Sequence, residues 1–187
     1  MPFDGFTQQN YAQKMVDEYK AAGVPARNVW AQSFDMNDVL YWIAHEPEFG
    51  AQAVALDDID PTDSNPNNDT PPALAELQAM YAQGILVVAP PMWALLALDA
   101  HGAIRPSQYA LDAKEAGLDI ITWTLERSGI LADGDGGWYY QTTNPVLNKE
   151  GDMLEVLHVL AKDVGIRGIF SDWPATVTYY ANCMGLK

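Results

Sequence analysis

The stretch Ile85-Leu86-Val87-Val88-Ala89 is the clearest strand signal in this 187-residue chain, and it decides the fold. An unbroken apolar and mostly β-branched run is typical of a strand buried on both faces of a parallel sheet. Shorter apolar runs at 29–34, 53–56, 119–125 and 168–171 predict four more strands. The sequence therefore predicts five strands in all.

Helical patterns separate these strands. The expected helices begin at Thr7, Asp35, Thr70, Ser107, Asp152 (paired with Glu155 as a cap) and Asp172. Residues 57–70 and 126–150 are rich in turn-forming residues and are expected to be loops. This alternation of strand and helix predicts an α/β fold with a parallel sheet. Eight such units close a TIM barrel of about 250 residues, so five units form either an open doubly wound sheet or part of a barrel.

The charge balance excludes several classes of partner. Ten Lys and Arg residues stand against 25 Asp and Glu, which gives a formal net charge of −15. Such a surface repels phosphate backbones and anionic lipids, so we expect no nucleic-acid partner and no peripheral membrane binding. No apolar run has the length of a membrane span. Cys183 stands alone, which excludes an internal disulfide, and we expect it to pack within the closing helix.

Carboxylates follow three of the predicted strands, at the edge where α/β folds carry their chemistry. Asp57, Glu126 and Asp172 could converge there as oxygen ligands for Mg²⁺ or Ca²⁺. The preferred interpretation is that Asp35 and Asp172 cap the helices they precede, because a carboxylate accepts hydrogen bonds from free N–H groups. None of the three histidines lies at a strand end.

Trp123 is the most informative aromatic residue, because it lies at the carboxyl end of the strand over 119–125. A large ring at this position can form the apolar wall of a ligand site. It can equally fill the core, and position alone does not decide between the two roles.

Three segments, taken in order, resemble the glycerophosphodiester phosphodiesterase family. They are Gln32-Ser33-Phe34-Asp35, Ile121-Thr122-Trp123-Thr124-Leu125 and Gly168-Ile169-Phe170-Ser171-Asp172-Trp173-Pro174. That family has a Ser-Phe strand end, a Trp-Thr-Val strand and a closing Gly-Ile-Ile-Thr-Asp-Tyr-Pro. Leu125 replaces the usual Val, and the third segment differs only by conservative replacements. Order, spacing and the βα rhythm extend the resemblance over nearly the whole chain.

The resemblance implies a metal-dependent TIM-barrel hydrolase of lipid metabolism. The family cleaves glycerophosphodiesters to glycerol phosphate and an alcohol, using histidines for proton transfer and Mg²⁺ or Ca²⁺ to reduce the charge of the phosphodiester. Trp123 matches the tryptophan that lines the glycerol end of the pocket, and Phe34 matches a strand-end aromatic near it. Gln32 and Asp172 match further barrel-end positions. The resemblance thus implies that these four residues bind substrate.

The catalytic half of the family does not match this sequence. The chain has no His-Arg-Gly motif, no Glu-x-Asp pair after it and no Glu-Leu-Lys-like third strand. Its five strands correspond to strands 4–8 of the family barrel. Residues 1–187 are therefore expected to be the C-terminal portion of a single domain, with no catalytic or metal residue of their own. Met1 would then be internal to a longer protein, which is expected to be periplasmic or secreted.

Three hypotheses stay open. The chain is half of a phosphodiesterase and inactive alone, or a non-catalytic α/β remnant that binds a small ligand or a partner. The third hypothesis is an intact open α/β hydrolase that uses Asp57, Glu126 and Asp172 with a metal. In the first case the five-strand arc exposes two sheet edges and an apolar lining, which promote association. The chain is then expected to self-associate or to require the missing N-terminal half.

Overall fold

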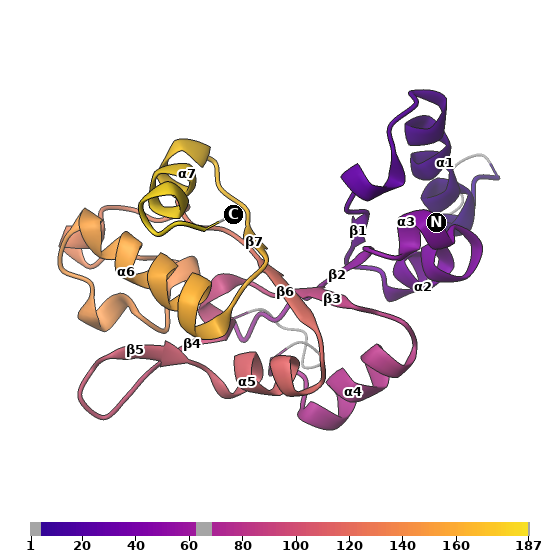
Figure 1. Cartoon of the computed structure of the whole chain (residues 1–187). Helices are drawn as coiled ribbons and strands as arrows, with labels where there is room; N and C mark the ends of the chain where they lie inside the picture. Colours follow the sequence, from indigo (N-terminus) through magenta and orange to yellow (C-terminus); the bar gives the residue numbers. More distant parts are fainter. Residues whose placement is uncertain (1–4, 63–68, 187) are drawn as a thin grey trace.

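The computed structural model describes residues 5–62 and 69–186 as an α/β fold on a sheet of five parallel strands (Figure 1). In sheet order these strands are β1 (Gln32–Ser33), β2 (Val54–Leu56), β3 (Val87–Ala89), β6 (Asp119–Thr122) and β7 (Gly168–Ile169). Every neighbouring pair is parallel. The prediction of parallel strands that are adjacent in chain order is confirmed.

The central strand β3 is buried on both faces, as its unbroken apolar sequence predicts. Val87 and Ala89 belong to one cluster together with Val54 of β2. Val88 points to the opposite face and joins the core beneath the helices. All of these side chains are at most 3% exposed. The sheet therefore has an inner apolar face and an outer face that the helices cover.

Seven α-helices of the described residues surround the sheet. They are α1 (Gln8–Ala21), α2 (Met36–His45), α3 (Pro47–Gly50), α4 (Leu74–Ala82), α5 (Gln108–Glu115), α6 (Met153–His158) and α7 (Pro174–Cys183). Thr7 caps α1 by accepting a hydrogen bond from the Asn10 N–H, and Asp35 caps α2 through the Asn37 N–H. Both predicted caps are confirmed. None of the helices in 5–62 and 69–186 combines the length and the apolar character that crossing a bilayer requires.

The beginnings of three helices differ from the predictions, and α7 is one of them, since it begins at Pro174 and not at Asp172. Helix α4 begins at Leu74 instead of Thr70, because the Glu76 carboxylate closes the first turn by accepting from the Ala73 N–H at 2.8 Å. Asp152 does not cap α6. Its carboxylate turns back instead and accepts a hydrogen bond from the Asn148 N–H at 2.8 Å.

The sequence did not reveal an antiparallel hairpin between β3 and α5. It consists of β4 (Leu96–Leu98) and β5 (Ile104–Pro106), which form a second, two-stranded sheet. Asp99 accepts from the N–H groups of His101 and Ala103, and Gly102 adopts a φ of +80° that favours glycine. These turn residues between Leu96-Ala97-Leu98 and Ile104-Arg105-Pro106 were the available signal.

Both segments expected to be loops contribute buried side chains, although residues 57–70 were expected to be exposed. Ile59 is 1% exposed, whereas residues 63–68 lie outside the described part of the chain. Leu131 and Tyr140, from the glycine-rich segment, are fully buried. The short turns are η1 (Ala26–Asn28), η2 (Met92–Leu95), η3 (Leu131–Asp133), η4 (Trp138–Tyr140), η5 (Asn144–Val146), η6 (Glu150–Asp152) and the π-helical η7 (Val159–Val164).

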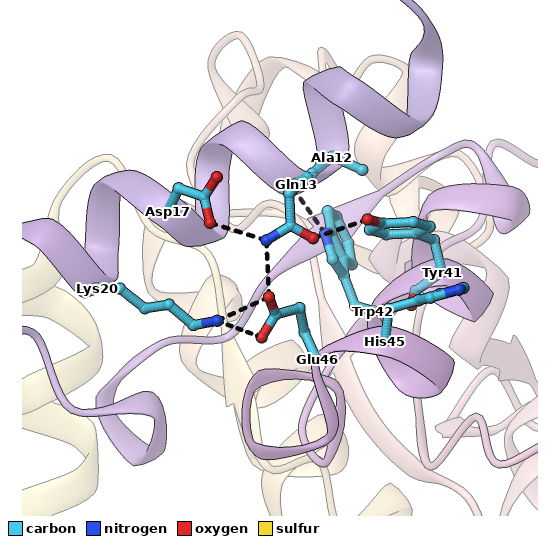
Figure 2. A network of polar contacts seen from close by, with 8 residues as sticks. All are labelled: Ala12, Gln13, Asp17, Lys20, Tyr41, Trp42, His45 and Glu46. Atoms are coloured by element: carbon cyan, nitrogen blue, oxygen red, sulfur yellow. Dashed lines mark hydrogen bonds and ion pairs between the residues drawn. The ribbon is translucent and has the colours of Figure 1, made fainter.

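A polar network fastens α1 to α2, the helix that follows β1 (Figure 2). The Gln13 side chain accepts from the Tyr41 hydroxyl at 2.7 Å and donates to the Glu46 carboxylate at 2.7 Å. Lys20 donates to the same carboxylate at 2.6 Å, and these two hydrogen bonds lower the pKa of Glu46. Beneath them, the indole N–H of Trp42 donates to the α1 backbone. The network fixes the helical layer against which β1 packs.

Gln13→Ala is expected to lower the free energy of unfolding by about 1–2 kcal/mol, because it leaves partly buried partners without their hydrogen bonds. Urea denaturation measures this loss. Lys14→Ala is the matched control on the neighbouring residue: Lys14 forms an exposed ion pair with Glu18, and such pairs contribute little. Equal effects of the two substitutions would show that the network does not stabilise the fold.

Candidate functional site

A cavity of about 230 Å³ lies at the carboxyl ends of the parallel strands. Its lining consists of Gln32, Phe34, Leu56, Trp123, Thr124, Arg127, Tyr139, Phe170 and Asp172. The structure thus brings together all four residues that the sequence predicted to bind substrate: Gln32, Phe34, Trp123 and Asp172. The binding role of these four residues stays a prediction.

Hydrogen bonds fix Trp123 at the junction of β3 and β6. Its indole N–H donates to the Ala89 carbonyl at 2.8 Å, and its own carbonyl accepts from the Met92 N–H at 2.8 Å. One residue earlier, the Thr122 hydroxyl donates to the Pro90 carbonyl at 2.8 Å. The orientation of the ring is therefore set by the backbone of the neighbouring strand.

Aromatic rings build the apolar walls around Trp123. Phe34 and Tyr139 meet its ring edge-on, each with a centroid distance of 6.0 Å and with interplanar angles of 90° and 75°. Trp138 stacks against it at 5.8 Å. Phe34 and Phe170 are 57% and 40% exposed, so their rings are accessible to a ligand. The cavity therefore has aromatic walls and one polar side.

Arg127 and Asp172 form that polar side. The Arg127 Nε donates to Asp172 Oδ2 at 2.9 Å, and this contact raises the pKa of the guanidinium. The Glu126 carboxylate accepts hydrogen bonds from the Ser171 hydroxyl at 2.6 Å and from the Asp172 N–H at 3.0 Å. The prediction that Asp172 caps the closing helix is wrong: α7 begins at Pro174 without a side-chain cap, because the carboxylate is engaged by Arg127.

The three strand-end carboxylates do not form a metal site. Asp57 turns toward α5, where it accepts from the Tyr109 hydroxyl at 2.9 Å, whereas Glu126 and Asp172 bind their own neighbours. Across 5–62 and 69–186, no group of three or more His, Cys, Asp or Glu residues could hold a metal ion. The described residues therefore do not fit the divalent metal that the resemblance implies.

The histidines and the cysteine lie in other parts of the fold. His158 Nδ1 is 3.0 Å from the Tyr180 hydroxyl, His101 lies in the β4–β5 turn, and His45 ends α2. Cys183 is exposed. The expectation that it packs within the closing helix is wrong, because α7 turns Tyr180 inward and Cys183 outward.

Five lining residues of the cavity were not assigned from the sequence: Leu56, Thr124, Arg127, Tyr139 and Phe170. The run Trp138-Tyr139-Tyr140 inside a glycine-rich loop was a signal for a folded aromatic wall. Phe170 ends a strand whose motif had been recognised. Nothing local distinguishes Arg127, because its place depends on a partner 45 residues away.

Comparison with known proteins places the chain in a family. No model of a protein family matches it. The chain is 44% identical over 193 residues to a protein of Arthroderma benhamiae described as an extracellular protein, and the match covers 100% of this chain and 76% of that protein. The chain belongs to the family of this extracellular protein. The name given to the relative describes no reaction.

A solved structure shares the fold. The chain is similar to the crystal structure of a glycerophosphodiester phosphodiesterase from Parabacteroides distasonis, with a TM-score of 0.56 and 14% identity. The match covers 95% of this chain and 52% of that one, so the chain spans about half the length of the solved protein. This likeness concerns the fold alone. It confirms an α/β arc of five parallel strands that matches about half of the phosphodiesterase structure.

Asp57 is expected to make stability depend on pH. Burial raises its pKa from 3.8 to about 6, outweighing the Tyr109 hydrogen bond, which lowers it. Between about pH 4 and 6 the folded chain keeps a proton that the unfolded chain has lost. This group's contribution is therefore complete below pH 4 and falls by at most about 3 kcal/mol as the pH rises to 6.

Asp57→Asn removes this titration, so the stability of the variant relative to the parent should increase from pH 4 to pH 6 and stay constant above. Urea unfolding at several pH values measures the difference. Asp99→Asn is the control, because backbone hydrogen bonds from Ala103 and His101 lower the pKa of Asp99 and place its effect on stability below about pH 4, so its difference from the parent should stay constant from pH 4 to 6. A constant difference for Asp57→Asn across this range would contradict the prediction.

Proposed function

We propose that residues 1–187 form the C-terminal, substrate-binding portion of a glycerophosphodiester phosphodiesterase-like domain. The observation that carries this proposal is the cavity in which Gln32, Phe34, Trp123 and Asp172 meet at the carboxyl ends of the strands. The shared fold with a solved phosphodiesterase supports it. The complete enzyme would hydrolyse a glycerophosphodiester to glycerol phosphate and an alcohol.

The cavity suits the glycerol end of such a substrate. The Trp123 face offers an apolar surface to C–H groups, while Asp172 and Gln32 offer an acceptor and an amide to hydroxyl groups. A volume of about 230 Å³ admits a small polyol. Arg127 is already paired with Asp172, so the site presents a balanced pair of charges.

The remaining chemistry is assigned to polypeptide outside the 187 residues. In this proposal that polypeptide supplies the histidines for proton transfer and the ligands for Mg²⁺ or Ca²⁺, which lowers the charge of the phosphodiester when bound. The substrate is a small molecule, and the acidic surface disfavours nucleic acids. The description of the Arthroderma relative as extracellular supports export of the whole protein.

The second candidate is a non-catalytic α/β module that binds a small ligand or a partner. The observation that favours it is that the cavity is already formed by the described residues, with its two charged groups, Arg127 and Asp172, paired with each other. The two candidates share the ligand site. They differ in whether additional polypeptide confers turnover.

Trp123→Ala is expected to weaken the binding of glycerophosphocholine by about tenfold or more, because the loss of an aromatic wall costs roughly 1.4 kcal/mol. Isothermal titration calorimetry with the purified chain measures this. Trp30→Ala is the matched control, since Trp30 precedes β1 at the opposite ends of the strands. Unchanged affinity of the Trp123 variant would remove the cavity as the substrate site.

The purified chain is expected to show no hydrolysis of glycerophosphocholine in the presence of Mg²⁺ or Ca²⁺. General acid–base catalysis alone contributes about 10²–10⁴-fold, and the described residues offer neither the positioned histidines nor a metal site. Release of choline measures turnover, and an intact phosphodiesterase serves as the positive control. Turnover by the 187-residue chain would contradict the proposal that the catalytic groups lie in other polypeptide.

A further inference from the structure

Arg127 and Asp172 are the two charged residues that line the cavity. Arg127 belongs to the loop that follows β6, and Asp172 follows β7, so both lie beyond the carboxyl ends of strands in the same sheet. Their side chains are 61% and 50% exposed, and an exposed ion pair contributes little to the stability of a fold. Stability therefore does not account for the place of this pair in the cavity wall.

Asp172 is held by its main chain as well as by its carboxylate. Its N–H donates to the Glu126 carboxylate at 3.0 Å, and the hydroxyl of the preceding Ser171 donates to the same carboxylate at 2.6 Å. The Arg127 Nε donates to Asp172 Oδ2 at 2.9 Å. Two consecutive residues after β6 thus hold two consecutive residues after β7, and the orientation of the Asp172 carboxylate at the cavity is fixed.

The contact between the two charged side chains uses one atom of each. In the part of the chain that the structure describes, Nε meets Oδ2, and the two parallel bonds of a bidentate pair are not formed. The second oxygen, Oδ1, accepts no hydrogen bond from a described residue and is left for a ligand. Asp172 and, to a smaller extent, Tyr139 raise the pKa of Arg127. The guanidinium therefore stays cationic, and Asp172 compensates its charge.

We propose that Asp172 determines the specificity of the cavity: by occupying Arg127, it selects a neutral, hydroxyl-bearing ligand group and excludes an anionic one. A free arginine in this wall would bind phosphate or carboxylate through charge-assisted hydrogen bonds. Beside Asp172 a second anion meets like charge, whereas a hydroxyl group donates to Oδ1. That the neutral group is the glycerol end of a substrate rests on the proposed function. The exclusion of anions rests on the ion pair alone.

The rest of the molecule does not supply this selection. The net charge of −15 disfavours anions over the whole surface, but salt screens it over about 8 Å at physiological ionic strength. Discrimination within the cavity therefore depends on groups that the ligand contacts. The other lining residues carry no formal charge. For a glycerophosphodiester, the selection by Asp172 would fix the direction of binding, with the glycerol end inside the cavity and the phosphate outside.

The test neutralises Asp172 and measures the affinity of the purified chain for inorganic phosphate. Asp172→Asn keeps the size of the side chain and the main-chain bond to Glu126, and it frees the guanidinium. Phosphate affinity is expected to rise at least about tenfold, because a hydrogen bond between charged groups is worth about that factor. An NMR titration that follows the Trp123 indole N–H measures this affinity and locates the phosphate in the cavity. In the double variant with Arg127→Gln, the gain should disappear.

Asp119→Asn is the matched control. Asp119 pairs with Arg167 at the amino end of β6, and their side chains are 42% and 56% exposed, so this variant also frees an arginine and changes the net charge equally. It should leave phosphate binding at the Trp123 signal unchanged. Asp172→Ser replaces Asp172→Asn if circular dichroism shows the latter to be unfolded.

Three results would overturn the proposal: no gain in phosphate affinity when Asp172 is neutralised, a gain that survives the loss of Arg127, or an equal gain with Asp119→Asn. Failure of the parent chain to bind glycerophosphocholine would overturn the proposed function instead. The phosphate titration does not depend on that substrate, so the two failures are distinguishable.

Discussion

The junction between β3 and β6 holds the candidate site in place. The register pairs Val88 with Ile120, and both side chains enter the core beneath the helices. Because alternate residues of a strand point to opposite faces, a slip of one residue would turn Ile120 inward and carry Trp123 away from the cavity. The indole N–H of Trp123 bonded to Ala89 opposes such a slip. The same pairing therefore specifies the core and orients the aromatic wall.

The paired charges of the site determine which part of a ligand it can bind. The chain carries a net charge of −15, yet at the cavity the Asp172 carboxylate is matched by Arg127 and that of Glu126 by hydrogen-bond donors. A pocket of this kind suits the uncharged part of a ligand better than a phosphate, which requires free cationic groups or a metal. In the proposed function the phosphodiester accordingly lies beyond this cavity and belongs to groups from outside the chain.

Sequence reasoning succeeded where local patterns determine the structure. The apolar runs predicted all five strands of the main sheet and their order, and Thr7 and Asp35 cap the helices that follow them. It failed where a distant partner decides. The Asp172 carboxylate pairs with Arg127, 45 residues away in sequence, instead of capping the helix. The glycine-rich loop folds inward because the Tyr140 hydroxyl donates a hydrogen bond to the Leu125 carbonyl.

The predicted site followed the same division. The residues implied by the family resemblance, Gln32, Phe34, Trp123 and Asp172, do converge on one cavity, because parallel strands bring their carboxyl ends to the same edge. The wall formed by Tyr139 was missed, since its place depends on the packing of Trp138 against Trp123 and not on a strand end.

The ligand cavity takes its walls from both edges of the sheet. Gln32 and Phe34 come from the β1 edge, whereas Phe170 and Asp172 come from the β7 edge. Any interaction that fixes the separation of β1 and β7 would preorganise the cavity, which removes part of the cost of binding a ligand. By linkage, a ligand that contacts both edges must strengthen such an interaction by the same factor.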